Sequence, residues 1–390
     1  MAGVKLIIQI INLSPGTVFK KYSDDYKIYR EVYQPHLIGL ELRDIPEQLA
    51  ETIQKIVLRE KEICYKNNSA DKKTTNLFIP GSLWNIKEIS RKILSVGDED
   101  LGYRIANVIK NYEEYESGSY NIGSRVFKFD RSYVMGILNV TPDSFSDGGL
   151  YLTSGEAIKH GLQMLDDGAD ILDIGGESTR PGAEITAESK EIERVIPVIK
   201  GILKERPEAV ISVDTTKKKV ASEALQLGAK IINDISALTS EPEMINVIKK
   251  NNASVVLMHM KGKPKDMQKN PFYDDVVKEI YDFLYEKSLL AAKAGIKNIF
   301  IDPGIGFGKR LEDNFELIRR LEDFKSLGFP ILIGVSRKSF IGKTLDLDVN
   351  ERDAATVSAE TVAVKNGAKV IRTHNVKYGV QVCKLLNNLC

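Results

Sequence analysis

Residues 135–149, MGILNVTPDSFSDGG, decide the fold because they show where a buried strand stops and a polar loop begins. Tyr133 and the apolar run that continues to Leu138 have the length and composition of a strand buried on both faces. The pattern turns polar at Asn139, and the loop Pro142–Gly149 is rich in Pro, Asp, Ser and Gly. The stretch therefore predicts a buried strand that delivers an amide to a ligand-facing loop.

From Tyr133 onward, apolar runs alternate with stretches of helical periodicity. Strands separated by helices pair in parallel, and eight such units predict an α/β protein with a (β/α)8 TIM barrel. An open doubly wound sheet usually has a glycine fingerprint after its first strand, which this chain lacks. The predicted strands are Val134–Val140, Ile171–Gly175, Val210–Asp214, Lys230–Asp234, Val255–Met258, Asn298–Asp302, Ile331–Val335 and Val370–Thr373. The predicted helices are Ala157–Leu165, Ile192–Leu203, Val220–Leu227, Val276–Ala292, Phe315–Phe324, Ala354–Val364 and Tyr378–Leu386.

Residues 1–118 lack this alternation and predict a smaller N-terminal α+β domain of unknown role, followed by the barrel domain over residues 119–390. The residues Glu113–Gly118 are the predicted linker, and Asn121–Asp130 is predicted to be a hairpin that closes the bottom of the barrel. Within the first domain, the pattern predicts a strand at Val4–Leu13, a helix at Pro46–Arg59, a polar loop at Asn67–Thr75, a short strand at Leu77–Pro80, and helices at Trp84–Leu94 and Leu101–Tyr112.

Composition excludes several classes of partner. The 390 residues carry 55 basic and 54 acidic side chains, so no general field favours nucleic acid or an anionic membrane. The longest N-terminal apolar run, Leu6–Leu13, is far shorter than the roughly 20 residues that span a bilayer. Three cysteines without metal-ligand spacing favour free thiols in a reducing cytoplasm.

Polar residues end every predicted strand of the barrel. In such a barrel the active site forms at the carboxyl ends of the strands, so these residues surround one mouth. A single polar residue at such a position is more often a structural cap, but eight converging ends favour a binding site. The strand ends carry Asn139, Glu177–Arg180, Asp214, Asn233–Asp234, Met258–Met260, Asp302, Ser336–Ser339 and Arg372–His374.

One part of this mouth suits a flat heterocycle with adjacent N–H donors. The carboxylates of Asp214 and Asp302 accept parallel hydrogen bonds, the amide of Asn233 donates and accepts, and Met258 and Phe307 cover the faces of a ring. The Gly-rich run from Asp302 to Lys309 is interpreted as a slim loop that positions Phe307, rather than as a phosphate loop.

The other part suits an anion. Arg372 and His374 lie on one face of the last strand, and Asn139 comes from the neighbouring first strand. Arg and His supply hydrogen-bond donors to a diphosphate, and the Asn139 amide oxygen can help to hold Mg²⁺. Lys338 follows the seventh strand, and Ser339 begins the next turn, where a hydroxyl and helix amides form a carboxylate site. We interpret His259 as structural and His160 as a surface residue.

The same positions carry a resemblance to the dihydropteroate synthase family, a group of pterin-binding TIM-barrel enzymes, over roughly residues 119–390. Beside the opening stretch, the resemblance rests on seven blocks in order: 173–182 (DIGGESTRPG), 212–215 (SVDT), 232–234 (IND), 258–262 (MHMKG), 302–309 (DPGIGFGK), 336–339 (SRKS) and 372–374 (RTH). One departure is Asn375, where the family pattern suggests an acid.

The resemblance implies that the chain joins 4-aminobenzoate to (7,8-dihydropterin-6-yl)methyl diphosphate in folate biosynthesis and releases diphosphate. It implies that Asp214, Asn233, Asp302 and Lys338 hold the pterin, beside Met258 and Phe307 in the same substrate site. It further implies that Thr179, Arg372, His374 and Asn139 handle diphosphate, Asn139 together with Mg²⁺, that Ser339 receives the aminobenzoate carboxylate, and that Arg180 is a further substrate-binding residue. The residues expected to be catalytic are Lys338, Asp302, Arg372 and His374. A homodimer is also implied.

Two other functions stay open at this level. A methyltetrahydrofolate-dependent methyltransferase shares this type of barrel but needs no diphosphate site, against which Arg372 and His374 argue. A non-catalytic pterin-binding protein would have lost strand-end residues, and this sequence retains them. The role of residues 1–118 does not follow from the pattern.

Overall fold

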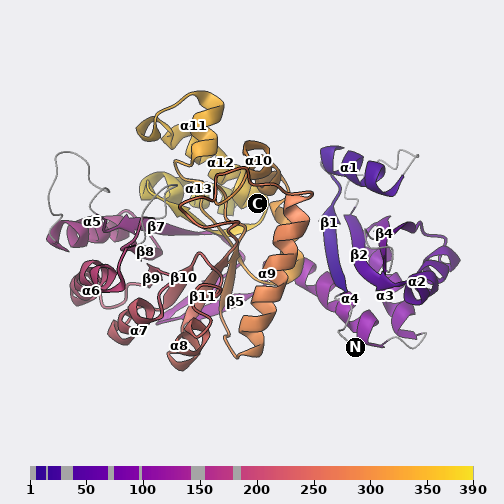
Figure 1. The fold of residues 1–390 in the computed structure, drawn as a ribbon, viewed down its shortest axis with the longest axis horizontal. Helices are drawn as coiled ribbons and strands as arrows, with labels where there is room; N and C mark the ends of the chain where they lie inside the picture. Colours follow the sequence, from indigo (N-terminus) through magenta and orange to yellow (C-terminus); the bar gives the residue numbers. More distant parts are fainter. Residues whose placement is uncertain are drawn as a thin grey trace. The chain divides into compact units, whose positions relative to one another are not determined.

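The computed structural model of the protein describes residues 6–14, 16–27, 38–68, 74–95, 99–141, 154–178 and 186–389 (Figure 1). The chain divides into two compact units: residues 1–115 with 322–328, and residues 116–321 with 329–390. The division between the two falls inside the predicted linker. Residues 322–328 group with the N-terminal unit although they lie far from it in the chain, so no local pattern of the sequence predicts this grouping.

The N-terminal unit is an antiparallel sheet of four strands with helices. The strand order is β1-β2-β4-β3, and one face of the sheet packs Leu6, Ile8, Leu40, Leu42 and Ile79 against α2, α3 and α4. The strands are β1 (Ile7–Asn12), β2 (Ile38–Pro46), β3 (Tyr65–Asn68) and β4 (Thr74–Gly81). The helices are α1 (Gly16–Tyr26), α2 (Glu47–Arg59), α3 (Leu83–Ser95) and α4 (Glu99–Glu113).

Three elements of this unit correct the sequence interpretation. The polar loop predicted at Asn67–Thr75 overlaps β3 and β4, since β3 is held by its antiparallel pairing with β4 rather than by its own YKNN sequence. β2 escapes recognition because Glu41 and Arg43 interrupt its apolar alternation, although both are buried. α1 is also unpredicted, and it buries Val18, Tyr22 and Tyr26 at helical spacing against Phe78.

The second unit is a closed parallel barrel surrounded by helices (Figure 1). The eight strands follow the order β10-β11-β12-β13-β14-β7-β8-β9, which is a (β/α)8 barrel and confirms the predicted fold. All eight predicted strands are present: β7 (Tyr133–Asn139), β8 (Ile171–Gly175), β9 (Ile211–Asp214), β10 (Ile231–Asp234), β11 (Ser254–Met258), β12 (Ile299–Asp302), β13 (Ile331–Ile333) and β14 (Ala368–Thr373).

The helices around the barrel include two that the sequence analysis does not predict, α8 (Met244–Lys250) and α11 (Ser339–Leu345), both too short to show clear periodicity. The helix predicted at Phe315–Phe324 is wrong in its bounds, because α10 (Leu311–Arg319) ends before the 3-10 turns η2 (Leu321–Leu327). The other helices are α5 (Ser154–Asp166), α6 (Glu188–Glu205), α7 (Lys218–Leu227), α9 (Val276–Lys293), α12 (Asp353–Lys365) and α13 (Val376–Leu389), with a short 3-10 turn at Val349–Glu351.

A hairpin closes the amino-terminal end of the barrel, as predicted. β5 (Ser119–Ile122) pairs with β6 (Arg125–Lys128), and Phe127 and Phe129 join the barrel core. The Tyr120 hydroxyl donates to the Ile299 carbonyl at 2.9 Å, at the start of β12. Because this end is plugged by aromatic side chains, the opposite end is the one that remains open to a ligand. No helix in the described ranges has the length and apolar character needed to cross a membrane.

Candidate functional site

A cavity of about 860 Å³ opens at the carboxyl ends of the barrel strands. It gathers ten of the side chains predicted to surround one mouth, although they come from seven strands or the loops that follow them. The predicted residues that line it are Asn139, Asp214, Asn233, Met258, Asp302, Phe307, Lys338, Ser339, Arg372 and His374. Thr179, Arg180 and the loop Pro142–Gly149 lie outside the described residues.

The floor of the cavity is a network of one guanidinium, two carboxylates and an amide. Arg372 Nε donates to Asp173 Oδ2 at 2.6 Å, and Arg372 Nη2 donates to Asp214 Oδ2 at 3.0 Å. Asn233 Nδ2 donates to the same Asp173 oxygen at 2.9 Å. Strands β8, β9, β10 and β14 thus contribute one side chain each. Buried ions are tolerated only when they are paired and hydrogen-bonded in this way.

Asp173 is the floor residue that the sequence analysis missed as a functional position. Its side chain is fully buried, and its Oδ1 has no hydrogen-bond partner in the described structure. The signal was an acid in the middle of the otherwise apolar strand Ile171–Gly175. It lies inside its strand, whereas the predicted site residues lie at the strand ends.

Burial and neighbouring charges shift the pKa values of this floor. Burial raises the pKa of Asp214 to about 7, with Arg372 opposing and Asp173 reinforcing the shift. Although burial alone would lower it, the two acids hold the pKa of Arg372 above its ordinary value. Arg372 therefore stays charged, and Asp214 is an acid that can exchange its proton near neutral pH.

A second acid and a lysine lie on the wall of the cavity. Asp302 Oδ1 accepts a 2.7 Å hydrogen bond from the Gly304 backbone N–H, while burial raises the pKa of Asp302 to about 6. Burial lowers the pKa of Lys338 to about 8, with Arg372 lowering it further. The Lys338 Nζ atom lies 4.0 Å from the centroid of the Phe307 ring, which is a cation–π contact.

Arg337, the residue before Lys338, has a strained backbone and forms an ion pair with Asp353. Arg337 has a φ of 55°, in the left-handed region that non-glycine residues rarely adopt. Its guanidinium donates to both oxygens of Asp353, at 2.7 and 2.9 Å. Asn375 Nδ2 donates to the same carboxylate at 3.0 Å. The amide at Asn375 therefore suits its site, because an acid there would face Asp353.

The rim carries His374 and Asn139. Ser336 Oγ lies 2.9 Å from His374 Nδ1, which orients the ring from the neighbouring strand. Asn139 ends β7, and its Oδ1 lies over Gly175, where no side chain intervenes. Among the described residues, no three His, Cys, Asp or Glu side chains are grouped to hold a metal. A single amide oxygen at the rim fits Mg²⁺ of the kind that binds mainly through substrate phosphates and keeps its waters.

The two histidines assigned elsewhere behave as interpreted. His259 is buried, with Nδ1 3.1 Å from Lys309 Nζ, and its pKa lies well below the ordinary value because of burial. His160, on α5, is exposed at the edge of the cavity.

Comparisons with known proteins agree with this geometry. The family model described as pterin binding enzyme matches residues 135–374. The chain is 45% identical over 272 residues to a dihydropteroate synthase of Synechocystis, covering 69% of this chain and 94% of that protein. It is 46% identical over 260 residues to the dihydropteroate synthase of Bacillus subtilis, covering 66% and 88%.

Solved structures give the same result. A Yersinia pestis dihydropteroate synthase in a sulfonamide drug complex aligns with a TM-score of 0.66 and 40% identity, covering 70% of this chain and 99% of that one. A Xanthomonas albilineans dihydropteroate synthase with 4-aminobenzoic acid aligns with a TM-score of 0.65 and 42% identity, covering 70% and 98%.

The raised pKa of Asp302 predicts a cost in stability above neutral pH. The contribution of the Asp302 carboxyl group to folding stability is fully present below its unfolded-state pKa of about 3.9. It is lost as the pH rises through its folded-state pKa of about 6. We therefore expect Asp302→Asn to be more stable, relative to the unsubstituted protein, at pH 8 than at pH 4. The difference in free energy of unfolding between the two proteins should change by on the order of 2 to 3 kcal/mol over this range. Urea unfolding at both pH values measures the difference. The exposed Asp274→Asn is the control, and a pH-independent difference for Asp302→Asn would contradict the assignment.

Proposed function

The chain belongs to the dihydropteroate synthase family, and from this premise we propose how its barrel mouth carries out the reaction. The reaction joins the amino group of 4-aminobenzoate to (7,8-dihydropterin-6-yl)methyl diphosphate, with release of diphosphate. The single observation that carries the assignment is the cavity itself, in which Asp214 and Asp302 face the same space as Arg372, His374 and Lys338. Neither a methyltransferase nor a silent binding protein is favoured by any contact in this cavity.

The pterin subsite is proposed at the floor. Asp302 is a buried acceptor, Asp214 is a largely buried one, and Asn233 is oriented by its hydrogen bond to Asp173. A bicyclic ring with adjacent N–H groups satisfies such acceptors, which would otherwise stay desolvated at a cost. Met258 and Phe307 supply the apolar walls for its faces. Held in this way, the ring presents its exocyclic carbon toward the rim.

The diphosphate subsite is proposed at Arg372 and His374, with Thr179 and Arg180 as further contacts. The carbon–oxygen bond breaks with its electron pair leaving on diphosphate, and the electron-rich dihydropterin stabilises the positive charge left on carbon. The aniline nitrogen then attacks that carbon to form the carbon–nitrogen bond, and its surplus proton passes to the released diphosphate. Because the leaving group gains charge in this step, positively charged donors fixed beside it lower the barrier. Arg372 is such a donor, since its two carboxylate partners fix its orientation.

The aminobenzoate carboxylate is proposed to bind beside Ser339, which is exposed at the mouth next to Lys338. This places the carboxylate end outward and the amino group toward the pterin carbon. Arg337, held by Asp353, fixes the backbone that presents both side chains. No covalent enzyme nucleophile is needed in this scheme.

Magnesium and location are further proposals. Asn139 would hold Mg²⁺ at the rim, where the ion would offset charge on the diphosphate. The thiols of Cys64 and Cys383 are free and buried, which suits the reducing cytoplasm that we propose as the location.

A homodimer is proposed through the outer faces of α10, α12 and α13. Helix α12 packs against both of the other helices. Together the three helices expose Leu311, Phe315, Val362, Tyr378, Leu385 and Leu389 to solvent. Apolar side chains gathered on adjacent helices favour burial against a second copy of the chain.

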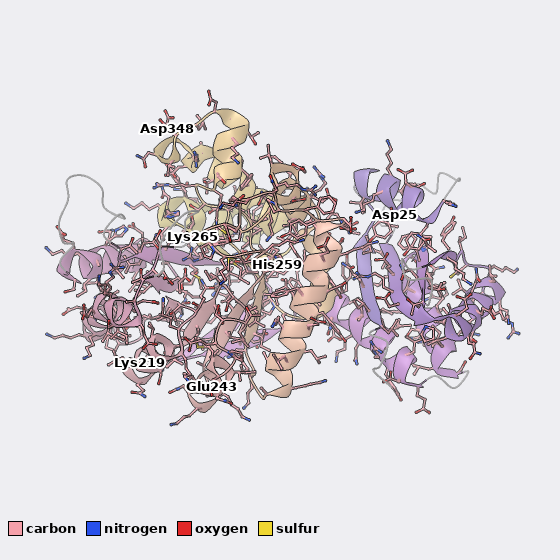
Figure 2. The ribbon with its side chains drawn as sticks, viewed as in Figure 1. Asp25, Lys219, Glu243, His259, Lys265 and Asp348 are labelled. Atoms are coloured by element: carbon pink, nitrogen blue, oxygen red, sulfur yellow. The ribbon has the colours of Figure 1, made fainter. Side chains whose placement is uncertain are left out.

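The function is tested by diphosphate release on mixing the two substrates with Mg²⁺. We expect release to require both substrates, and Arg372→Ala to lower kcat by about 100-fold or more, because it removes a donor to the departing charge. Lys219→Ala, at an exposed position on α7 (Figure 2), removes one positive charge away from the mouth and is the matched control. Near-normal kcat in Arg372→Ala would remove diphosphate stabilisation from the mechanism.

The metal proposal predicts a magnesium requirement that depends on Asn139. Treatment with EDTA should abolish turnover, and added Mg²⁺ should restore it. Asn139→Ala should raise the Mg²⁺ concentration for half-maximal rate, because it removes the only proposed protein oxygen on the ion. Asn246→Ala, exposed on α8, should behave as the unsubstituted protein. An unchanged requirement in Asn139→Ala would exclude this residue as a ligand.

The dimer proposal predicts twice the monomer mass by light scattering. Introducing charge with Val362→Glu and Leu385→Glu together should give the monomer mass, because two carboxylates would be buried unpaired. Tyr103→Glu, exposed on α4, should leave the mass unchanged. A monomer for the unsubstituted chain would end the proposal.

A further inference from the structure

The loop after β12 is held from behind by side chains that all donate to its carbonyls. Gln268 Nε2 donates to the Gly306 carbonyl at 2.6 Å, Lys309 Nζ to the Phe307 carbonyl at 2.9 Å, and the Tyr273 hydroxyl to the Gly308 carbonyl at 2.7 Å. Three consecutive backbone carbonyls therefore each accept a hydrogen bond from a side chain. This leaves the loop one arrangement in which all of them are satisfied.

Glycine lets this loop approach the segment that follows β11. A Cβ atom on Gly304 would lie 1.9 Å from the His259 carbonyl oxygen, and one on Gly308 would lie 2.1 Å from the Lys261 carbonyl oxygen. Both glycines have positive φ, 70° and 63°. The two backbones are thus in contact without intervening side chains.

Lys309 is the charged member of the three donors, and it is buried. Only 3% of its surface is exposed, and its ammonium reaches three acceptors: His259 Nδ1 at 3.1 Å, the His259 carbonyl at 3.3 Å and the Phe307 carbonyl at 2.9 Å. An ammonium has three N–H donors, so this set matches it completely. The His259 ring is neutral because burial holds its pKa low, so Nδ1 can accept. The contacts account for a lysine that burial alone would tend to deprotonate, since burial lowers the pKa of Lys309 to about 7.

The carbonyl held by Lys309 belongs to the residue that faces the cavity. The Phe307 ring contacts Lys338 Nζ at 4.0 Å, and both side chains line the mouth. Lys309 itself lies behind the loop and shares a smaller second cavity with Arg310 and Lys343. A displacement of the Phe307 backbone would therefore move the pterin-facing wall and the lysine beside it.

We propose that Lys309 is a positioning residue that fixes Phe307, and through Phe307 the ammonium of Lys338, at the pterin subsite. The inference rests on the pterin subsite proposed above and adds a residue that does not touch the substrate. Gln268 and Tyr273 hold the neighbouring carbonyls. Lys309 holds the carbonyl of Phe307 itself and so fixes the position of the Phe307 ring.

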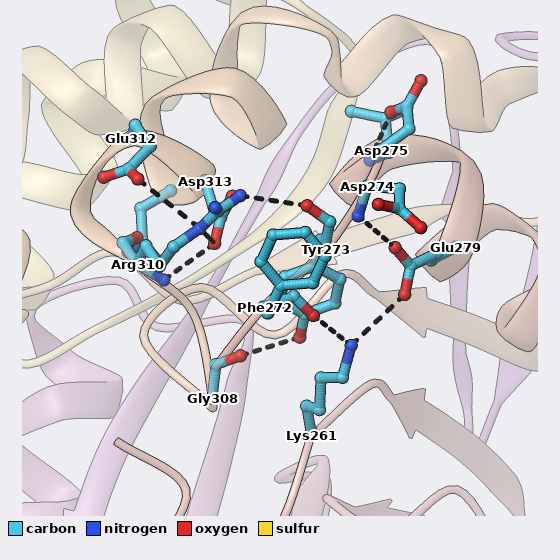
Figure 3. A network of polar contacts seen from close by, with 12 residues as sticks. Lys261, Phe272, Tyr273, Asp274, Asp275, Glu279, Gly308, Arg310, Glu312 and Asp313 are labelled. Atoms are coloured by element: carbon cyan, nitrogen blue, oxygen red, sulfur yellow. Dashed lines mark hydrogen bonds and ion pairs between the residues drawn. The ribbon is translucent and has the colours of Figure 1, made fainter. Parts of the chain in front are cut away.

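An outer network anchors this support (Figure 3). Lys261 donates to the Phe272 carbonyl and, at 3.3 Å, to Glu279, which also accepts from the Asp274 backbone N–H at 2.8 Å. Arg310 Nη2 donates to the Tyr273 carbonyl at 3.2 Å and to Asp313 at 2.7 Å. The segment that supports the loop is thereby tied to α9 and α10.

The test compares Lys309→Met with Lys343→Met. The first removes three N–H donors while keeping an unbranched chain, and the second removes a similar charge from an exposed lysine of the adjoining cavity. We expect Lys309→Met to raise KM for the dihydropterin diphosphate, and Kd for 6-hydroxymethylpterin by calorimetry, by about tenfold. Lys343→Met should change neither by more than about twofold. Thermal unfolding is followed for each variant. A lower Tm with unchanged KM and Kd would overturn the proposal, since a purely structural role would do only that.

A double-mutant cycle with Phe307→Leu tests whether Lys309 acts on pterin binding through Phe307. If Lys309 acts through Phe307, the effect of Lys309→Met on pterin Kd should largely vanish in the Phe307→Leu background. Retention of the full effect would overturn the proposal. Should Lys309→Met fail to fold, Lys309→Gln, which keeps N–H donors without the charge, carries the same cycle with a smaller expected effect. Failure of diphosphate release would instead concern the function itself, so the two failures are distinguishable.

Discussion

Compensation of buried charge is the constraint on which the mouth of this barrel depends. Asp173 has no exposed surface, and it can remain in the strand only because Arg372 and Asn233 both donate to it. Arg372 in turn can lie among apolar strands only because two carboxylates face it. Parallel closure brings β8, β9, β10 and β14 close enough for these four side chains to meet. The interactions that compensate the buried charges of the barrel interior therefore also form part of the substrate site.

The sequence predicted the barrel well because strand and helix signals there agree. Each strand is a short apolar run ended by a polar residue, and parallel pairing follows from the helices between them. The N-terminal unit was harder, because β2 buries Glu41 and Arg43 among apolar residues and so hides its period. The short edge strand β3 has no signal of its own and exists through pairing with β4. Tertiary contacts decide such elements, and a single sequence does not display them.

The candidate site also contains residues that the sequence predicts and residues that it does not. Ten of the predicted residues line one mouth, since topology alone brings strand ends together. Two other strand-end residues do not line it: Glu177 pairs with Lys217, and Asp234 accepts from the backbone of the turn that follows it. Asp173 and Lys309 were not assigned, because both act behind the surface that touches a ligand. A buried acid inside an apolar strand and a buried lysine after a glycine-rich loop are costly residues, and hydrogen-bonding partners compensate each of them. Such positions are recognised from contacts, which the spacing of residues along the chain does not reveal.

The pairing of Asp214 with Arg372 has a consequence for what can enter the cup. One oxygen of the Asp214 carboxylate accepts from Arg372 Nη2, and a carboxylate can accept further hydrogen bonds on its two oxygens. A heterocycle whose ring N–H and amino group lie side by side can use that remaining capacity without breaking the ion pair. A molecule of the same size that presents acceptors along this edge would instead meet the lone pairs of the carboxylate and be repelled. The cup therefore selects its ligand by the direction of hydrogen bonds as well as by volume.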